Sequence, residues 1–151
     1  MVRLKNRYIV LQIEPRDPKD SSNFTLSSDA IMQVIKDKIE QLHGDFGMAS
    51  IQAGFTAKYC NEYTKIAIAR ARHGPHKLVT SSIPFINKIG SRNVNVRILY
   101  IGATIKKCFC FIKQYQEKAF EEVCVKLKTP EERRAVREAI NNFQSALKSM
   151  E

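Results

Sequence analysis

The chain has 151 residues, a length that suits one compact domain with an appendage and leaves little room for two full domains. Lys and Arg number 25 against 15 Asp and Glu, which gives a net charge of +10, and 44% of the residues are hydrophobic. The hydrophobic content excludes a chain that is disordered throughout, and the charge favours polyanionic partners. No apolar run reaches the roughly 20 residues that a membrane-spanning helix needs, and the basic start has no signal-cleavage pattern, so we expect neither a membrane nor a secreted protein.

The first half of the sequence predicts a strand, a helix and a hairpin. Residues 8–13 are rich in β-branched and large apolar side chains, and the prolines that follow end this strand. Ser27 or Ser28 offers a helix cap, and Gly44 is expected to end the helix. Residues 48–59 alternate between apolar and polar types and predict a half-buried strand, and a turn at Asn61-Glu62 leads into another strand that is apolar on both faces. The expected helix carries an apolar stripe of Ile31, Val34, Ile35, Ile39 and Leu42.

The second half completes the pattern. Gly74-Pro75 opens a second helix, which Pro84 must shorten, and residues 94–101 have the β-branched content of a fourth strand. The resulting order β-α-β-β-α-β predicts the α+β class: an RRM-like, ferredoxin-like split β-α-β domain with a four-stranded antiparallel sheet. We expect this domain to cover residues 1–115.

Additional C-terminal helices are expected after it, with residues 116–151 as a helical extension. Thr104 can cap a third helix, and Thr129-Pro130 combines a cap with a first-turn proline for a last one. The apolar stripe of that last helix is Val136, Ala139, Ile140, Phe143 and Leu147.

RRM-like sheets bind single-stranded RNA by stacking bases on aromatic residues of the first and third strands of the chain. The third strand here, residues 64–72, has no aromatic residue. Phosphate and shape contacts are therefore expected to replace stacking, with a solvated basic surface as the alternative. The candidate cations are Arg3, Lys5, Arg7, Lys58, Lys65, Arg70, Arg72, Lys106 and Lys107.

The apolar character of both faces of the third strand also predicts that the sheet is covered, either by the third helix or by a partner protein. The residues expected at this protein interface are Ile66, Ala67, Ile68, Ala69, Ala71, Phe109 and Ile112.

Catalytic and metal-binding patterns are weak. The four cysteines form no CxxC pair and the three histidines complete no ligand spacing, so we expect reduced thiols and no metal site. Glu14, Asp17 and Asp20 could hold Mg²⁺, but they lie in a proline-rich loop, where solvated carboxylates are ordinary. No nucleophile motif is present, so we expect no catalytic residue and no bound cofactor in this chain.

Several motifs, taken in order, resemble one protein family. They are Met1 to Tyr8 at the start, Leu42 to Gly47, Gly54-Phe55 with Lys58-Tyr59 and Asn61 to Thr64, Arg70-Ala71-Arg72, Ile83 to Ile86 and Gly102 to Lys106. Together they resemble the "Pop-five" family of protein subunits of ribonuclease P and ribonuclease MRP, over residues 1 to about 115. Ala103 departs from the family pattern, which often has a second glycine there.

The resemblance implies an RRM-like, non-catalytic RNA-binding subunit that supports a catalytic RNA in the maturation of precursor tRNA 5′ ends and in rRNA processing. It implies that Mg²⁺ is bound by the partner RNA, that barrel-shaped and other protein subunits join the particle, and that the chain works in the nucleus and nucleolus. The RNA-contacting positions that it implies are Arg3, Lys5, Arg7 and Tyr8, followed by Lys58, Tyr59, Arg70, Arg72, Thr104 and Lys106.

Two alternatives remain at this level. A free-standing RRM-like RNA-binding protein would need its own stacking aromatics, which the third strand lacks. A small hydrolase of the same fold would need a glycine-rich phosphate loop after the first strand, where residues 14–18 have two prolines and no glycine.

Overall fold

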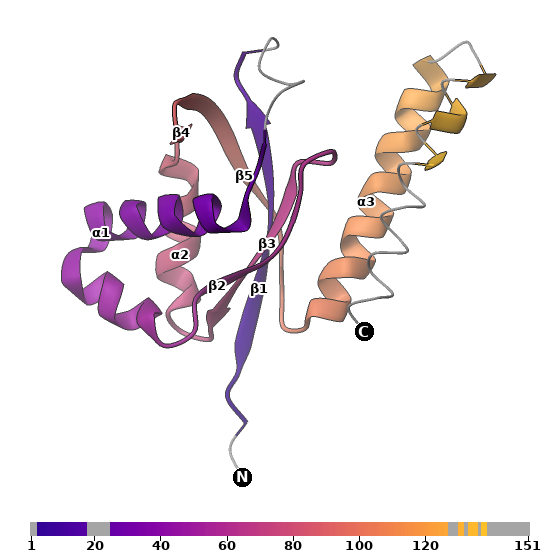
Figure 1. The fold of residues 1–151 in the computed structure, drawn as a ribbon. Helices are drawn as coiled ribbons and strands as arrows, with labels where there is room; N and C mark the ends of the chain where they lie inside the picture. Colours follow the sequence, from indigo (N-terminus) through magenta and orange to yellow (C-terminus); the bar gives the residue numbers. More distant parts are fainter. Residues whose placement is uncertain (1–2, 18–24, 127–129, 132, 136, 139–151) are drawn as a thin grey trace. The chain divides into compact units, whose positions relative to one another are not determined.

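The computed structural model describes residues 3–17, 25–126, 130–131, 133–135 and 137–138, and Figure 1 shows their arrangement. They belong to two compact units, one ending at Cys108 and one beginning at Phe109. The elements are β1 (Asn6–Pro15), α1 (Ser28–Gln52), β2 (Thr56–Asn61), β3 (Ile66–Arg72), α2 (His76–Ser82), the 3-10 helix η2 (Ile83–Phe85), β4 (Lys88–Ile89), β5 (Arg92–Gly102) and α3 (Ile105–Lys126). Among the described residues, no helix has both the length and the apolar character needed to cross a membrane.

The first unit is a five-stranded antiparallel sheet in the order β2-β3-β1-β5-β4, with α1 and α2 on the same face (Figure 1). The predicted α+β class and split β-α-β order are confirmed. The strand beyond the predicted four is β4, which pairs with the start of β5 through a tight turn at Gly90, where φ is +62°. Two residues are too few to show an alternating pattern, so this strand was not predicted.

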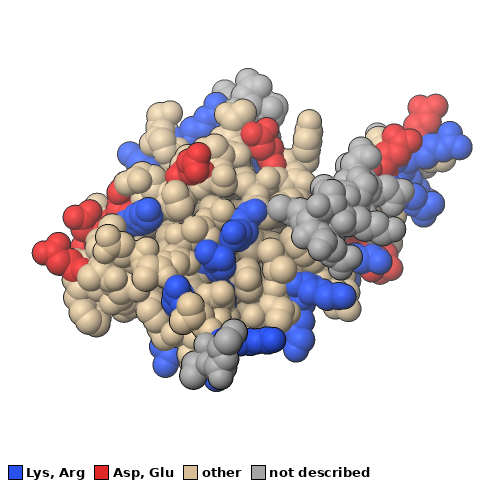
Figure 2. All heavy atoms as spheres, turned by 60° about the horizontal axis from the view of Figure 1, so that its bottom comes forward, with Lys and Arg blue, Asp and Glu red and all other residues tan. Residues whose placement is uncertain are grey.

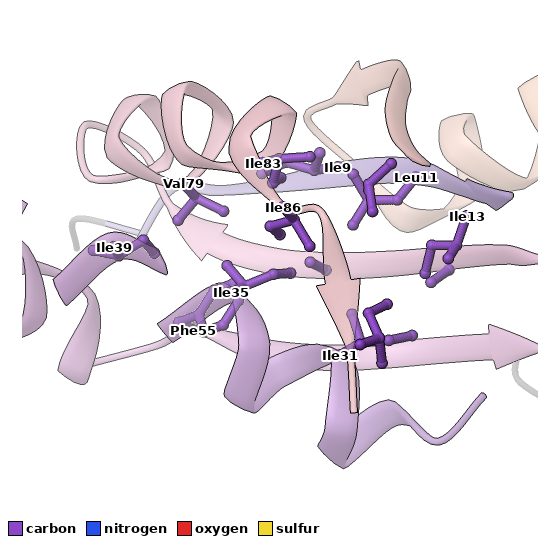
Figure 3. Close-up of a cluster of buried hydrophobic side chains, with 14 of the residues drawn as sticks. Ile9, Leu11, Ile13, Ile31, Ile35, Ile39, Phe55, Val79, Ile83 and Ile86 are labelled. Atoms are coloured by element: carbon purple, nitrogen blue, oxygen red, sulfur yellow. The ribbon is translucent and has the colours of Figure 1, made fainter. Parts of the chain in front are cut away.

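The core lies between the sheet and the two helices. Ile9, Leu11 and Ile13 of β1 alternate toward the helices and are fully buried. Each isoleucine that is removed from water in this way stabilises the fold by about 1.5 to 3 kcal/mol. The side chains that meet them from the helices include Ile31, Ile35 and Ile39 of α1 and Val79 of α2, with Ile83 of η2 (Figure 3).

The start and the kink of α1 both follow from single residues. The predicted cap is confirmed at Ser27, whose side-chain oxygen accepts a hydrogen bond from the Ala30 amide at 3.1 Å. Gly44 has φ +60° and ψ −152°, which glycine adopts without steric cost, so the helical path breaks there as predicted. Leu42, predicted in the buried stripe, is instead 45% exposed because the stripe ends just before this kink.

The predicted strand at residues 48–59 is wrong in its first part. The chain resumes a helical path after Gly44 and stays helical to Gln52, and β2 begins only at Thr56. Gly47, Ile51 and Phe55 are all buried, and their four-residue spacing is that of a helix face. The intervening alanines fit a period of 2 and a period of 3.6 equally well, which explains the error.

Pro84 shortens the second helix as predicted, since α2 stops at Ser82 and gives way to η2. Phe85 is 57% exposed, because it ends the tighter 3-10 turn that replaces a further turn of α-helix.

α3 begins where predicted: the Thr104 hydroxyl accepts a hydrogen bond from the Lys107 amide at 3.4 Å. Within the second unit, Phe111 and Tyr115 stack one turn apart, with ring centroids 6.1 Å apart. Most of the predicted last helix, including its stripe of Val136, Ala139, Ile140, Phe143 and Leu147, lies outside the described residues.

Candidate nucleic-acid interface

The alternation of β1 sorts its side chains between two faces of the sheet. Ile9 and its alternate neighbours face the helices, so Tyr8, Val10 and Gln12 lie on the other face, which we call the outer face. Residues directly opposite one another on paired strands share a face. The strand register therefore gives the membership of the outer face row by row.

The first row crosses four strands. Thr56 of β2 lies opposite Arg70 of β3, Arg70 lies opposite Tyr8 of β1, and Tyr8 lies opposite Gly102 of β5. The Thr56 hydroxyl oxygen and the Arg70 Nε atom are both buried without a hydrogen-bond partner within the described part of the chain. Arg70 and Tyr8, two of the predicted RNA-contacting residues, are thus neighbours on one face.

The second row carries two tyrosines at its ends, Tyr59 of β2 and Tyr100 of β5, with Ile68 and Val10 between them. Both tyrosines follow an irregularity in register: β2 gains a residue between Ala57 and Tyr59, and β5 gains one between Ile98 and Tyr100. A β-bulge of this kind re-aims the side chains that follow it. Strict alternation would have assigned both tyrosines to the helix side.

Tyr59 is held in place by its neighbours. The Asn61 side-chain amide donates a hydrogen bond to the Tyr59 hydroxyl at 2.9 Å, and burial raises the pKa of Tyr59 above its usual value. Tyr100 is an outer-face residue that was not predicted from the sequence, because only the register shift in β5 places it there.

The end of the sheet at the start of β1 is strongly basic. Antiparallel pairing sets Asn6 opposite Arg72, so Lys5 and Arg7 lie beside the end of β3. The Arg72 guanidinium donates from Nε to the Ala53 carbonyl at 2.6 Å, which fixes its stem against the loop before β2. Figure 2 turns this end of the sheet toward the viewer and shows Lys and Arg side chains gathered over it.

These cations lack acidic partners within the described part of the chain. No carboxylate there forms an ion pair with Lys5, Arg7, Arg70 or Arg72, and the ion pair described in the first unit is instead Arg97 with Glu14, at 2.9 Å. A basic cluster without local neutralisation attracts an external polyanion.

The remaining predicted RNA-contacting residues are more dispersed. Arg3 is exposed at the beginning of the described chain, and Lys58 is exposed at the bulge of β2. Thr104 caps α3, and Lys106 and Lys107 are exposed on its first turn. The structure therefore gathers Tyr8, Arg70 and Arg72 at one end of the sheet, and Lys58 lies on β2 two residues after Thr56, the partner of Arg70.

The predicted protein interface divides in two. Ala67, Ala69 and Ala71 pack into the core beneath the chain's own helices, so they are core positions and are not a surface for a partner. Alternation leaves Ile66 and Ile68 on the outer face, where both side chains are also buried. The other two predicted residues, Phe109 and Ile112, belong to α3 in the second unit.

The thiols and carboxylates show no catalytic arrangement among the described residues. All four cysteines are free, and burial raises the pKa of the Cys60 and Cys108 thiols to about 11. No group of three or more metal-binding side chains occurs in the described ranges. Glu14 pairs with Arg97 and Asp17 is exposed, while Asp20 lies outside the described residues.

Comparison with known proteins agrees with this fold. The family model described as "Rpp14/Pop5 family" matches residues 7–113. The curated relative "Ribonuclease P/MRP protein subunit POP5" of Bos taurus is 33% identical over 122 residues, which cover 78% of this chain and 71% of the relative. The protein of the same name from Danio rerio is 31% identical over 146 residues, which cover 93% of this chain and 85% of the relative.

A chain in the cryo-EM structure of yeast ribonuclease MRP shares the fold, with a TM-score of 0.54 and 16% identity, over 84% of this chain and 99% of that one. The family match covers most of the first unit and includes the rows of the outer face. The chain therefore belongs to the Rpp14/Pop5 family.

Proposed function

We propose that this chain is a non-catalytic, RNA-binding protein subunit of ribonuclease P and ribonuclease MRP, which supports the catalytic RNA in precursor tRNA 5′-end maturation and in rRNA processing. The observation that carries the proposal is the basic end of the sheet, where Lys5, Arg7, Arg70 and Arg72 gather without acidic partners in the described part of the chain. The relatives named as subunits of these particles support the same assignment.

The proposed mechanism is electrostatic. Folding an RNA active site brings phosphates together, and a protein of net charge +10 offsets part of the repulsion that would otherwise require more metal ions. Arginine suits this task because its planar guanidinium can donate two parallel hydrogen bonds to one phosphate. Arg70 is on β3, with strands paired on both sides, and Arg72 is tethered to the Ala53 carbonyl, so both would be held on a rigid support.

The decisive experiment compares two charge reversals in the tagged full-length chain. Arg70→Glu should reduce the amount of co-purifying RNA severalfold, whereas Lys88→Glu, the same kind of change on β4 at the far edge of the sheet, should change it by less than about twofold. Sequencing should identify one or two stable non-coding RNAs. A diffuse population of messenger RNAs would instead support a free-standing RNA-binding protein, and equal effects of the two reversals would refute the proposed surface.

The same proposal assigns the chain to the nucleus and nucleolus, with precursor tRNA and a barrel-shaped protein subunit as partners. The family resemblance supports these assignments. A fluorescent fusion that stays outside the nucleus in growing cells would contradict the location, and mass spectrometry of the purified complex tests the protein partner.

A further inference from the structure

The three histidines of the chain are unevenly distributed, and two of them lie at the basic end of the sheet. The β1–β3 pairing is extended by a hydrogen bond from the His73 amide to the Lys5 carbonyl, at 2.9 Å. Gly74, with φ +103°, then turns the chain so that α2 begins at His76. This turn brings residues 73–77 back to the start of β1.

His73 and His76 are in contact. Their ring centroids lie 5.3 Å apart with an interplanar angle of 37°. The Gly74 amide donates a hydrogen bond to His76 Nδ1 at 3.1 Å, so the neutral ring of His76 carries its proton on Nε2. His73 is exposed and His76 is partly buried, and this difference makes His73 the more accessible of the two to a ligand.

The groups around His76 are basic. Partial burial lowers the pKa of His76, and the positive fields of His73, Arg7 and Lys77 lower it further, against a smaller opposing effect of a hydrogen bond with the Arg72 backbone. From α1, the titratable group that reaches α2 is His43, whose Nε2 lies 3.0 Å from the Ser81 hydroxyl.

Strand alternation puts Arg7 on the helix-side face with Ile9, and its Nη1 atom donates a hydrogen bond to the Asn6 carbonyl at 3.2 Å. Within the described residues, neither Arg7 nor Lys77 forms an ion pair. His73 and His76 are thus in contact, Arg7 and Lys77 lie close enough to act on His76 electrostatically, and none of the four forms an ion pair among the described residues.

We propose that His73, His76, Arg7 and Lys77 form a proton-linked binding site for a backbone phosphate of RNA. The inference rests on the proposed RNA-binding function and adds a specific site and a pH dependence to it. A bound phosphate favours the charged form of each imidazole, so binding takes up protons from the solvent. The exposed His73 imidazolium can donate its N–H groups to phosphate oxygens. In His76 the added proton goes to Nδ1, which must first give up the hydrogen bond that it accepts from the Gly74 amide.

The experiment measures binding of a labelled oligouridylate to the full chain between about pH 6 and 8 at constant ionic strength, a range in which histidine titrates and uracil does not. The wild-type affinity should rise as the pH falls, by up to about tenfold per pH unit for each proton taken up. The double variant His73→Gln/His76→Gln should lose most of this slope and still bind through the other cations. The matched control is His43→Gln, which removes the third histidine and should keep the wild-type slope.

A second measurement, on the unaltered protein, follows the His76 ring proton by NMR. The pKa of His76 should rise when oligouridylate is added, because the phosphate opposes the surrounding positive charge. If the double variant keeps the wild-type pH dependence of binding, or if RNA leaves the pKa of His76 unchanged, the phosphate site is refuted. The proposed RNA-binding function would stand in either case. If the wild-type chain binds no oligouridylate at low salt at any of these pH values, the proposed RNA-binding function fails with it.

Discussion

A single methyl group at residue 102 should destabilise the first unit. A Cβ atom built on Gly102 would lie 2.8 Å from the Cys108 Sγ atom and 2.9 Å from Tyr100 Cε1, where ordinary contacts begin near 3.4 Å. Both neighbours would have to move by about half an ångström, and overpacking of this kind costs about 1 to 3 kcal/mol. Alanine also lowers the conformational entropy of the unfolded chain, which stabilises the folded state by about 0.4 to 1 kcal/mol and offsets part of this cost. Gly102→Ala should therefore lower the free energy of unfolding by about 1 to 2 kcal/mol.

Urea denaturation, followed by tyrosine fluorescence and circular dichroism, measures this change, and a double-mutant cycle tests its cause. Cys108→Ala removes the sulfur atom that the new methyl group would strike. Gly102→Ala should therefore cost about 1 kcal/mol less in the Cys108→Ala background than in the wild type. If the two changes are additive within about 0.5 kcal/mol, the sulfur contact is not the source of the destabilisation.

The remaining predictions concern burial, charge and reactivity. Ala69→Lys places an unpaired charge in the core, so the variant should fail to fold, and a normal circular dichroism melting curve would contradict the assigned burial. Replacing Arg3, Lys5 and Arg7 with Glu should weaken oligouridylate binding, and the slope of the logarithm of the binding constant against the logarithm of salt concentration should become shallower by about 0.7 per lost phosphate contact. An unchanged slope would mean that these cations face solvent and do not contact phosphate. Burial raises the pKa of the Cys108 thiol to about 11, so in mildly alkaline buffer the folded protein should be alkylated at Cys108 at least about 100-fold more slowly than the protein unfolded in urea. Mass spectrometry measures both rates, and equal rates would contradict the burial of this thiol.

Features with a local cause were predictable from the sequence. Ser27 caps α1 through its own side chain, Gly44 breaks the helix through its own backbone freedom, and Pro84 shortens α2 by its own ring. In each case the residue type is sufficient to specify the local structure. The order of the main elements follows from such signals, joined to the periodicity of apolar residues.

Features that depend on strand pairing were not predictable. Residues 48–52 are helical because the helical path buries Ile51 in the core. The alternation of alanines in this segment does not reveal that tertiary contact. The three alanines of β3 were assigned to a protein interface, but the sequence does not indicate which of the two apolar faces the helices cover. Their small size is explained only by the helices that pack above them.

The two bulges have a consequence for RNA recognition. By shifting register in β2 and in β5, they bring Tyr59 and Tyr100 onto the outer face, in one row and on the two strands that flank the centre. Stacking of the RRM type uses the two central strands, where this row instead has Ile68 and Val10. Tyr59 is further restrained by its hydrogen bond with Asn61. Aromatic residues are therefore present on this face, but the row's centre is aliphatic, so the basic end of the sheet remains the part of the described chain best suited to hold RNA, through its phosphates.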